Sequence, residues 1–235
     1  MAASTGGAPA GAPTTSTPAT TPAATAPAIH TDPVTARSRS VAYKGPVYEK
    51  TATGEVVPYQ PLAPTPTGQV GGATGGSPVG SPVGQTADTK PDLLVPGTLA
   101  RYVNGLAAAP MSVPEPIQQI IWSANQIIGL PYIYGGGHAS FTSPGYDCSG
   151  TVSFALHGAD LLTTPMDSSE FMVWGSHGAG RYVTVFANGG HAYMTVAGLR
   201  LDTSSADDPS NQQGPRWRPL RPANEGFTVR HPLGM

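Results

Sequence analysis

The chain has 235 residues, and its 12 Lys and Arg against 14 Asp and Glu give a net charge of −2. Because no cluster of basic residues accompanies this balance, we expect no nucleic-acid partner. One cysteine, and histidines without metal-ligand spacing, exclude a disulfide framework and a thiolate zinc site, so we expect no metal and no cofactor. No apolar run approaches the roughly 18 residues that cross a bilayer, and we expect no transmembrane segment.

The N-terminal part of the chain is rich in Ala, Thr, Pro, Gly and Ser, and 18 of the 26 prolines lie in the first 116 residues. Such a composition buries too little apolar surface to offset the entropy of ordering, which predicts a disordered low-complexity linker over residues 1–90. The first residues lack the charged start and continuous apolar core of an intact signal peptide. We therefore expect either another export route or a true start further upstream.

Residues 91–112, which include "DLLVPGTLARYVNGLAAAP", are apolar with two internal breaks and predict a short adapter packed on a following domain. That domain, residues 113–235, opens with a predicted helix. Ser112 and Glu115 have the spacing of a capping box. The apolar residues of this segment form one helical stripe, which Gly129 and Pro131 end: Ile117, Ile120, Ile121, Ala124 and Ile128.

A glycine-rich loop, "YIYGGGHASFTSPGYDCSG", follows without any phosphate-binding spacing. It leads into a second predicted helix that starts near Cys148 and stops at Gly158. Four short segments rich in β-branched and aromatic residues then predict antiparallel strands: "RYVTVFAN", "GHAYMTVAG", "LRLDTS" and "GFTVRHP". Two helices followed by strands predict an α+β domain with one core.

Cys148, the single cysteine, is the residue whose interpretation decides the predicted function. A lone cysteine is most often a small buried hydrophobic residue. At the start of a helix, however, unpaired N–H groups and the helix dipole favour the thiolate and can stabilise an oxyanion. The alternatives are therefore an inert core cysteine and a nucleophile, and a nucleophile needs a base.

Among the histidines, His191 is the best candidate for that base. His157 lies on the helix of Cys148 but faces the opposite side, whereas His138, in the glycine-rich loop, can line the same cleft. Three others lie in the linker, in a loop and near the C-terminus: His30, His177 and His231.

A two-residue turn at Ala197 and Gly198 would pair Tyr193 with Asp202 and place Asp202 diagonal to His191. A carboxylate there would orient the imidazole. The alternative is a solvated aspartate at a strand end.

The segments "PYIYGGGHASFTSPGYDCSGTVSFAL" and "GGHAYMTVAG" resemble the NlpC-type cell-wall peptidases, papain-like cysteine hydrolases of bacterial peptidoglycan, over residues 117–229. The resemblance implies a papain-like domain with helices packed on a small antiparallel sheet. It implies that Cys148 is the nucleophile, His191 the base and Asp202 the third polar residue. It also implies that the substrate cleft is lined by Tyr134, Asp147 and Ser149, and His138 extends the loop beside them. The long "WGSHGAGRYVTVFANGGHAYM" segment, with "GLRLDTS" and "RHP", is similar to an actinobacterial branch.

This family membership would make the protein a secreted or cell-wall-associated monomer that cleaves an amide of peptidoglycan stem peptides. The implied bond joins D-isoglutamate to a diamino acid. Two other interpretations remain open: a non-catalytic wall-binding module with a relic site, and a thiol amidase or acyltransferase that acts on a non-wall substrate.

Overall fold

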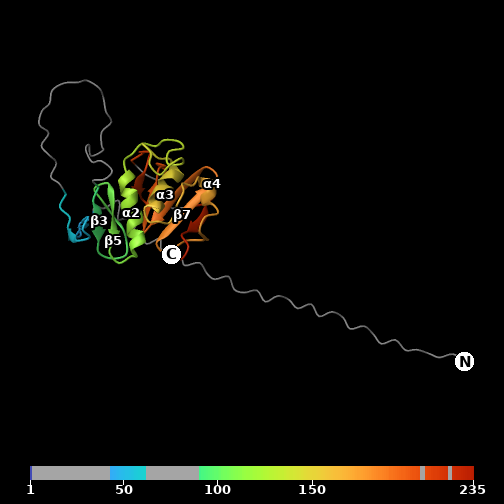
Figure 1. Ribbon diagram of the computed structural model, residues 1–235, viewed down its shortest axis with the longest axis horizontal. Coiled ribbons are helices and arrows are strands. Elements are labelled where there is room, and N and C mark those ends of the chain that lie inside the picture. The colour runs from blue at the N-terminus through green and yellow to red at the C-terminus, as the bar shows by residue number, and fades with distance from the viewer. Residues whose placement is uncertain (2–42, 62–89, 207–209, 222–223) are drawn as a thin grey trace, which may run out of the picture.

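The computed structural model describes Met1 and residues 43–61, 90–206, 210–221 and 224–235. Two β-sheets and a few helices make up this part of the chain, which confirms the α+β prediction. Figure 1 shows the order across the molecule: a small sheet that contains β3 and β5, then helix α2, then α3 with the larger sheet that contains β7.

The smaller sheet has five strands in the order β2-β1-β3-β5-β4, in which only β3 and β5 are parallel. Its strands are β1 (Tyr48–Lys50), β2 (Val56–Pro58), β3 (Asp92–Val95), β4 (Arg101–Val103) and β5 (Leu106–Pro110). The predicted adapter, residues 91–112, therefore provides three strands of a sheet.

The prediction of a disordered linker over residues 1–90 is wrong for residues 43–61, because β1 and β2 lie there. β1 pairs with β3, and Tyr48 lies opposite the buried Leu94. A short segment can form a strand when another strand is available to pair with it, and composition alone does not reveal that pairing. The remainder of the predicted linker, apart from Met1 and Lys90, lies outside the described residues.

Helix α2 (Glu115–Ile127) lies between the smaller sheet and helix α3 (Cys148–His157) (Figure 1). The predicted stripe is confirmed from Ile117 to Ala124, all of it fully buried. The predicted capping box is wrong, because Pro114 is the N-cap and no side chain caps the helix. The amide of Ser112 instead donates to the carbonyl of Gly97, which places Ser112 in the turn after β5.

Asn125, in the last turns of α2, joins the helix to both sheets. Its side-chain amide exchanges two hydrogen bonds with the backbone of Ala107 in β5, at 3.0 and 2.8 Å. Its Oδ1 also accepts a bond of 2.8 Å from the indole of Trp217. Asn125 is fully buried, so these bonds satisfy polar groups that would otherwise be costly to bury. The two sheets and α2 share one continuous apolar core.

The larger sheet is antiparallel, with six strands in the order β10-β9-β8-β7-β11-β6. Its strands are β6 (Ser176–His177), β7 (Val183–Asn188), β8 (His191–Val196), β9 (Leu199–Asp202), β10 (Arg216–Arg218) and β11 (Thr228–His231). The four predicted strands are confirmed as β7, β8, β9 and β11. The edge strands β6 and β10 were not predicted, because each has only two or three residues.

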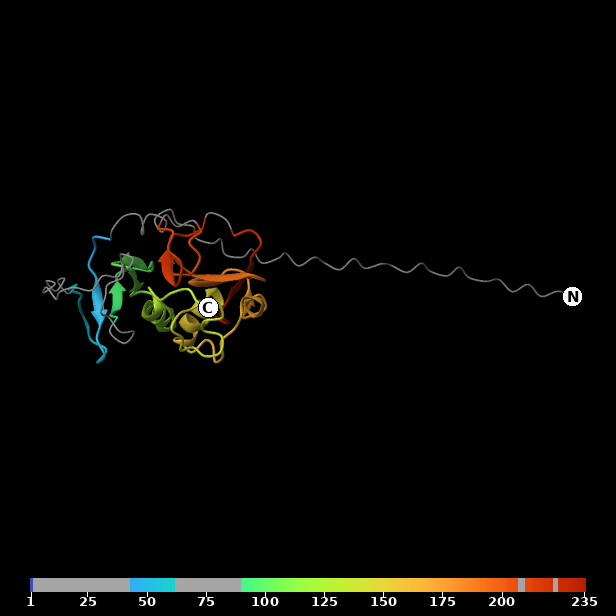
Figure 2. The same cartoon turned by 90° about the horizontal axis from the view of Figure 1, so that it is seen from above.

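One face of this sheet packs on the helices, as the view from above shows (Figure 2). Alternation along β8 and β9 puts Met194 and Leu201 on that face, and it turns His191 and Asp202 to the other. A third short helix, α4 (Ser168–Phe171), lies beside β7. No helix in the described ranges is long and apolar enough to cross a membrane.

Candidate active site

Cys148 is the first residue of α3, and Asp147 before it caps the helix. Oδ1 of Asp147 accepts a bond of 2.8 Å from the amide of Gly150, and its backbone carbonyl accepts from the amide of Thr151 at 3.0 Å. The first amides of a helix have no acceptor within the helix. The amides of Cys148 and Ser149 are therefore the ones that remain for a ligand at this end.

The glycine-rich loop packs tightly against this helix start. The amide of Asp147 donates to the carbonyl of Gly136 at 3.2 Å. A Cβ at Gly150 would overlap the same carbonyl, so only glycine allows the loop to approach the helix this closely. The "YGGG" and "DCSG" segments thus form one unit that fixes the position of the thiol.

His191 and Asp202 meet across the β8–β9 hairpin. Ala197 and Gly198 form the predicted two-residue turn, with positive φ at both residues (44° and 90°), the geometry that suits a tight hairpin. Met194 pairs with Leu201, and the next step of this register places Tyr193 opposite Asp202, as predicted. Nε2 of His191 lies 2.9 Å from Oδ1 of Asp202.

The interpretation of Asp202 as a solvated surface residue is wrong, because only 1% of it is exposed. Oδ1 also accepts a bond of 2.9 Å from the amide of Ser204. Oδ2 lies 3.3 Å from Nη1 of Arg200, an ion pair that lacks hydrogen-bond geometry. Sequence reasoning missed Arg200, although a charged residue two positions before Asp202 on one strand must share its face.

The imidazole of His191 also lies near the thiol of Cys148, which acts on its pKa. Since Nε2 faces Asp202, Nδ1 is the nitrogen that remains for the sulfur. Burial favours the neutral ring, but hydrogen bonds to Asp202 and Cys148 and the charges of both outweigh it and raise the pKa of His191 to about 9. A histidine with this pKa is protonated at neutral pH.

The predicted substrate-binding residues separate into two groups. Asp147 and Ser149 are buried, and His138 covers them: its Nε2 lies 3.0 Å from Oδ2 of Asp147 and 2.9 Å from Oγ of Ser149. Oδ2 of Asp147 also accepts a bond from the amide of Gly135, so this carboxylate holds the loop in place. Tyr134 is 91% exposed and projects into solvent.

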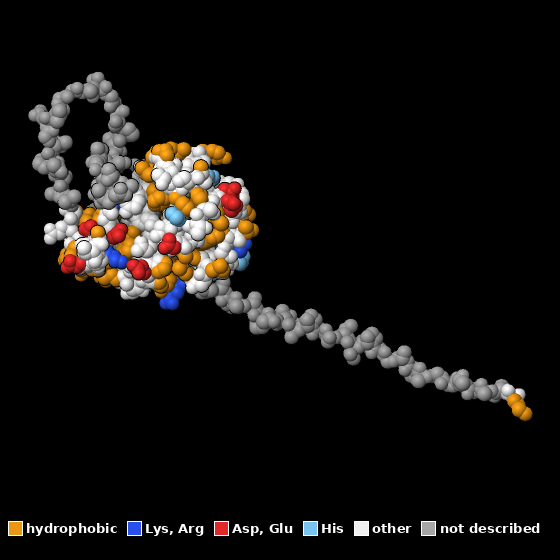
Figure 3. Space-filling model, viewed as in Figure 1, with side chains coloured by type: hydrophobic (Ala, Val, Ile, Leu, Met, Phe, Trp, Pro, Cys, Tyr) orange, Lys and Arg blue, Asp and Glu red, His pale blue; other side chains and the backbone are white. Residues whose placement is uncertain are grey.

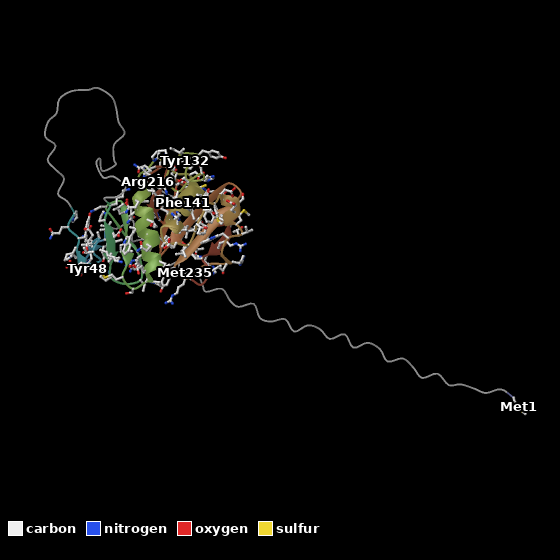
Figure 4. The ribbon with its side chains drawn as sticks, in the orientation of Figure 1. Met1, Tyr48, Tyr132, Phe141, Arg216 and Met235 are labelled. Carbon is white, nitrogen blue, oxygen red and sulfur yellow. The ribbon has the colours of Figure 1, made fainter. Side chains whose placement is uncertain are left out.

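Tyr132 is a further residue of the site that sequence reasoning missed. Partial burial, and then the charges of Cys148 and Asp147, raise the pKa of its phenol, so the ring lies within electrostatic reach of Cys148. It lies 41% exposed at the upper edge of the molecule in Figure 4, where apolar side chains also gather in Figure 3. The signal for Tyr132 was the first tyrosine of "PYIY", but only the second was selected.

The other histidines have structural contacts or lie apart. His157 stacks on Phe141, with 3.7 Å between the ring centroids, and its Nδ1 bonds to the carbonyl of Leu162. His231 bonds to the carbonyl of Gly178, whereas His177 is exposed in β6 and His30 lies outside the described residues. Within the described part of the chain, no group of three or more His, Cys, Asp or Glu side chains is arranged to hold a metal ion.

The structure therefore brings a thiol at a helix start together with a histidine and an aspartate that lie on one hairpin. No protein-family model matches the chain, and no curated protein matches it either.

Proposed function

We propose that the protein is a cysteine endopeptidase that cleaves an amide bond in the stem peptides of bacterial peptidoglycan. The observation that carries the proposal is the arrangement of Cys148, at the start of α3, near a histidine whose Nε2 lies 2.9 Å from the buried carboxylate of Asp202. Nucleophile, base and orienting group are the parts that amide hydrolysis through a covalent intermediate needs. The resemblance to NlpC-type peptidases supports the choice of substrate, and it favours the bond between D-isoglutamate and a diamino acid.

In the proposed reaction, the Cys148 thiolate attacks the amide carbonyl and forms the carbon–sulfur bond. The amides of Cys148 and Ser149 hold the resulting oxyanion. His191 then gives its Nδ1 proton to the leaving nitrogen as the carbon–nitrogen bond breaks. Neutral His191 next takes a proton from water, which attacks the thioester and releases the carboxylate product and the thiolate.

The test is digestion of purified peptidoglycan, followed by mass spectrometry of the released fragments. We expect one new amine and one new carboxylate from a single type of stem-peptide bond. Cys148→Ala and His191→Ala should both lower the rate by roughly 1,000-fold or more. His177→Ala, at an exposed histidine of β6, serves as the matched control and should retain the wild-type rate.

Failure of the folded wild-type protein to release any fragment would overturn the proposal. Binding to walls without cleavage would identify a wall-binding module instead. Transfer of an acyl group to an added amine, without release of wall fragments, would identify an amidase or acyltransferase that acts on another substrate.

A further inference from the structure

Behind the proposed catalytic residues, the sheet buries an arginine that faces the aspartate. Arg200 has no exposed surface, and its Nη1 lies 3.3 Å from Oδ2 of Asp202. A second contact fixes the guanidinium, since Nη2 donates a bond of 2.7 Å to the carbonyl of Ala206. Burial of a charged arginine is unfavourable unless a partner compensates for the lost hydration.

Asp202 uses its two carboxylate oxygens differently, and Arg200 faces one of them. Its Oδ1 already accepts from His191 and from the amide of Ser204. Among the described residues, Oδ2 has no hydrogen bond, so the positive charge of Arg200 is the interaction that stabilises this oxygen. A carboxylate buried without such a partner takes up a proton more readily and then no longer balances an imidazolium.

Arg218, on the neighbouring strand β10, binds backbone carbonyls and not the carboxylate of Asp202. It is also fully buried, yet its guanidinium donates to backbone carbonyls at Asp202, Thr203, Gln212 and Gly214. Arg218 therefore holds the chain on either side of the loop after β9, whereas Arg200 faces the carboxylate itself.

Charged and titratable groups surround the His191–Asp202 pair from every adjoining element. They are Cys148 from α3, Tyr132 from the loop before α3, Tyr193 from β8, Arg200 from β9, Arg218 from β10 and Arg221 after β10. Of these groups, Arg200 is the one whose guanidinium forms an ion pair with Oδ2 of Asp202, the oxygen without a hydrogen bond.

We propose that Arg200 is a positioning residue that holds the Asp202 carboxylate in the orientation that faces His191, and thereby sets the pH range in which Cys148 and His191 react. The catalytic part of this inference rests on the proposed function. The titration of Cys148 and His191, however, can be measured without any substrate. Without the guanidinium, the Asp202 carboxylate is no longer held toward His191, so the hydrogen bond and charge that raise the pKa of His191 weaken. Removal of Arg200 should therefore move the titration of the imidazole to lower pH and that of the thiol to higher pH.

The experiment uses the fact that Cys148 is the only cysteine in the chain. The rate of alkylation by iodoacetamide is measured against pH, and the imidazole of His191 is followed by NMR, with His191→Gln to assign its signal. We expect Arg200→Gln to lower the imidazole midpoint and to raise the alkylation midpoint, each by about one unit, and to slow alkylation about tenfold below the wild-type midpoint. Arg200→Lys keeps the charge and should restore both midpoints to near the wild-type values.

The matched control is Arg230→Gln, because Arg230 also donates to a backbone carbonyl, at Met172, and lies on β11 with β8 and β7 between it and β9. Its midpoints should equal those of the wild type. If Arg200→Gln folds and leaves both midpoints unchanged, Arg200 is only a structural residue and the inference is overturned.

Should Arg200→Gln fail to fold, the same change is made together with Asp202→Asn, because replacement of both members of a buried ion pair is tolerated better than removal of one. Because Arg200 acts through the carboxylate, the double variant should titrate at the same pH as Asp202→Asn alone, and a further shift would overturn the inference. A wild-type protein that does not digest walls would instead refute the proposed function and leave this result standing.

Discussion

The imidazole of His191 and the carboxylate of Asp202 lie 2.9 Å apart because a two-residue turn sets the register of the strands that carry them. The side-chain period of a strand is two, so a slip of one residue would turn Asp202 to the other face of the sheet. The turn at Ala197 and Gly198 therefore determines whether His191 has its carboxylate.

Replacement of Asp202 by asparagine should lower both the pKa of His191 and the rate of cleavage. The hydrogen bond and the charge of Asp202 raise the pKa of His191 to about 9, and an amide supplies no charge. We expect a pKa at least about one unit lower by NMR, and a kcat lowered roughly 100-fold or more with less change in KM. An unchanged imidazole titration would show that Asp202 does not act on His191.

Protonation of His191 should also make the stability of the fold depend on pH. Its pKa of about 9 lies above the ordinary 6.5, so the stabilisation is complete below pH 6.5 and is lost as the pH rises to 9. We expect the free energy of unfolding to fall by roughly 1–3 kcal/mol across this window, measured by urea titration.

The control for that measurement is His191→Gln, whose curve should be flatter in the same window. Burial lowers the pKa of Lys90 to about 8, which gives a slope of opposite sign at higher pH. Lys90 is present in both proteins, so the difference between the two curves isolates His191. A difference that does not change with pH would contradict the raised pKa.

Tyr132 and Tyr134 offer a matched pair of variants two positions apart. Tyr132→Phe removes a hydroxyl beside Cys148 and should lower kcat/KM several-fold, whereas Tyr134→Phe changes a ring that is 91% exposed and should have little effect. The measurement is the rate of peptidoglycan digestion by both variants under the same conditions. Equal effects would show that Tyr132 has no special place at the site.

Substitution of Gly150 should disrupt the start of α3. A methyl group there overlaps the carbonyl of Gly136 and contacts Gly137, so the loop and the helix have to separate. We expect Gly150→Ala to lower the free energy of unfolding by about 1–3 kcal/mol and to slow alkylation of Cys148. Gly189→Ala, where a methyl group meets open space, should remain within about 0.5 kcal/mol of the wild type.

The sequence was sufficient to predict those parts of the fold that local patterns specify. Alternation along "HAYMTV" and the turn at Ala197 and Gly198 predicted the register of the hairpin, and the stripe in α2 predicted its buried face. The helix start near Cys148 also followed from the glycine-rich loop before it, and the structure adds that Asp147 caps this helix.

What the sequence did not predict depends on contacts between distant segments. The strand at Tyr48–Lys50 has too few residues for a reliable pattern, and it is ordered by pairing with β3 more than 40 positions away. The contact of Arg200 with Asp202 depends on burial, which an isolated "GLRLDTS" segment does not reveal. His138 was placed near the site, but its bonds to Asp147 and Ser149 depend on how the loop folds back.

Asn125 gives the molecule a mechanical property. Because its amide locks α2 to β5 on one side and to Trp217 on the other, a pull on the small sheet is passed directly to the helix packed against α3. The small sheet is therefore held in a fixed orientation relative to the helices that carry and support Cys148. The position of the small sheet relative to Cys148 is thus set by contacts at β5, away from the thiol itself.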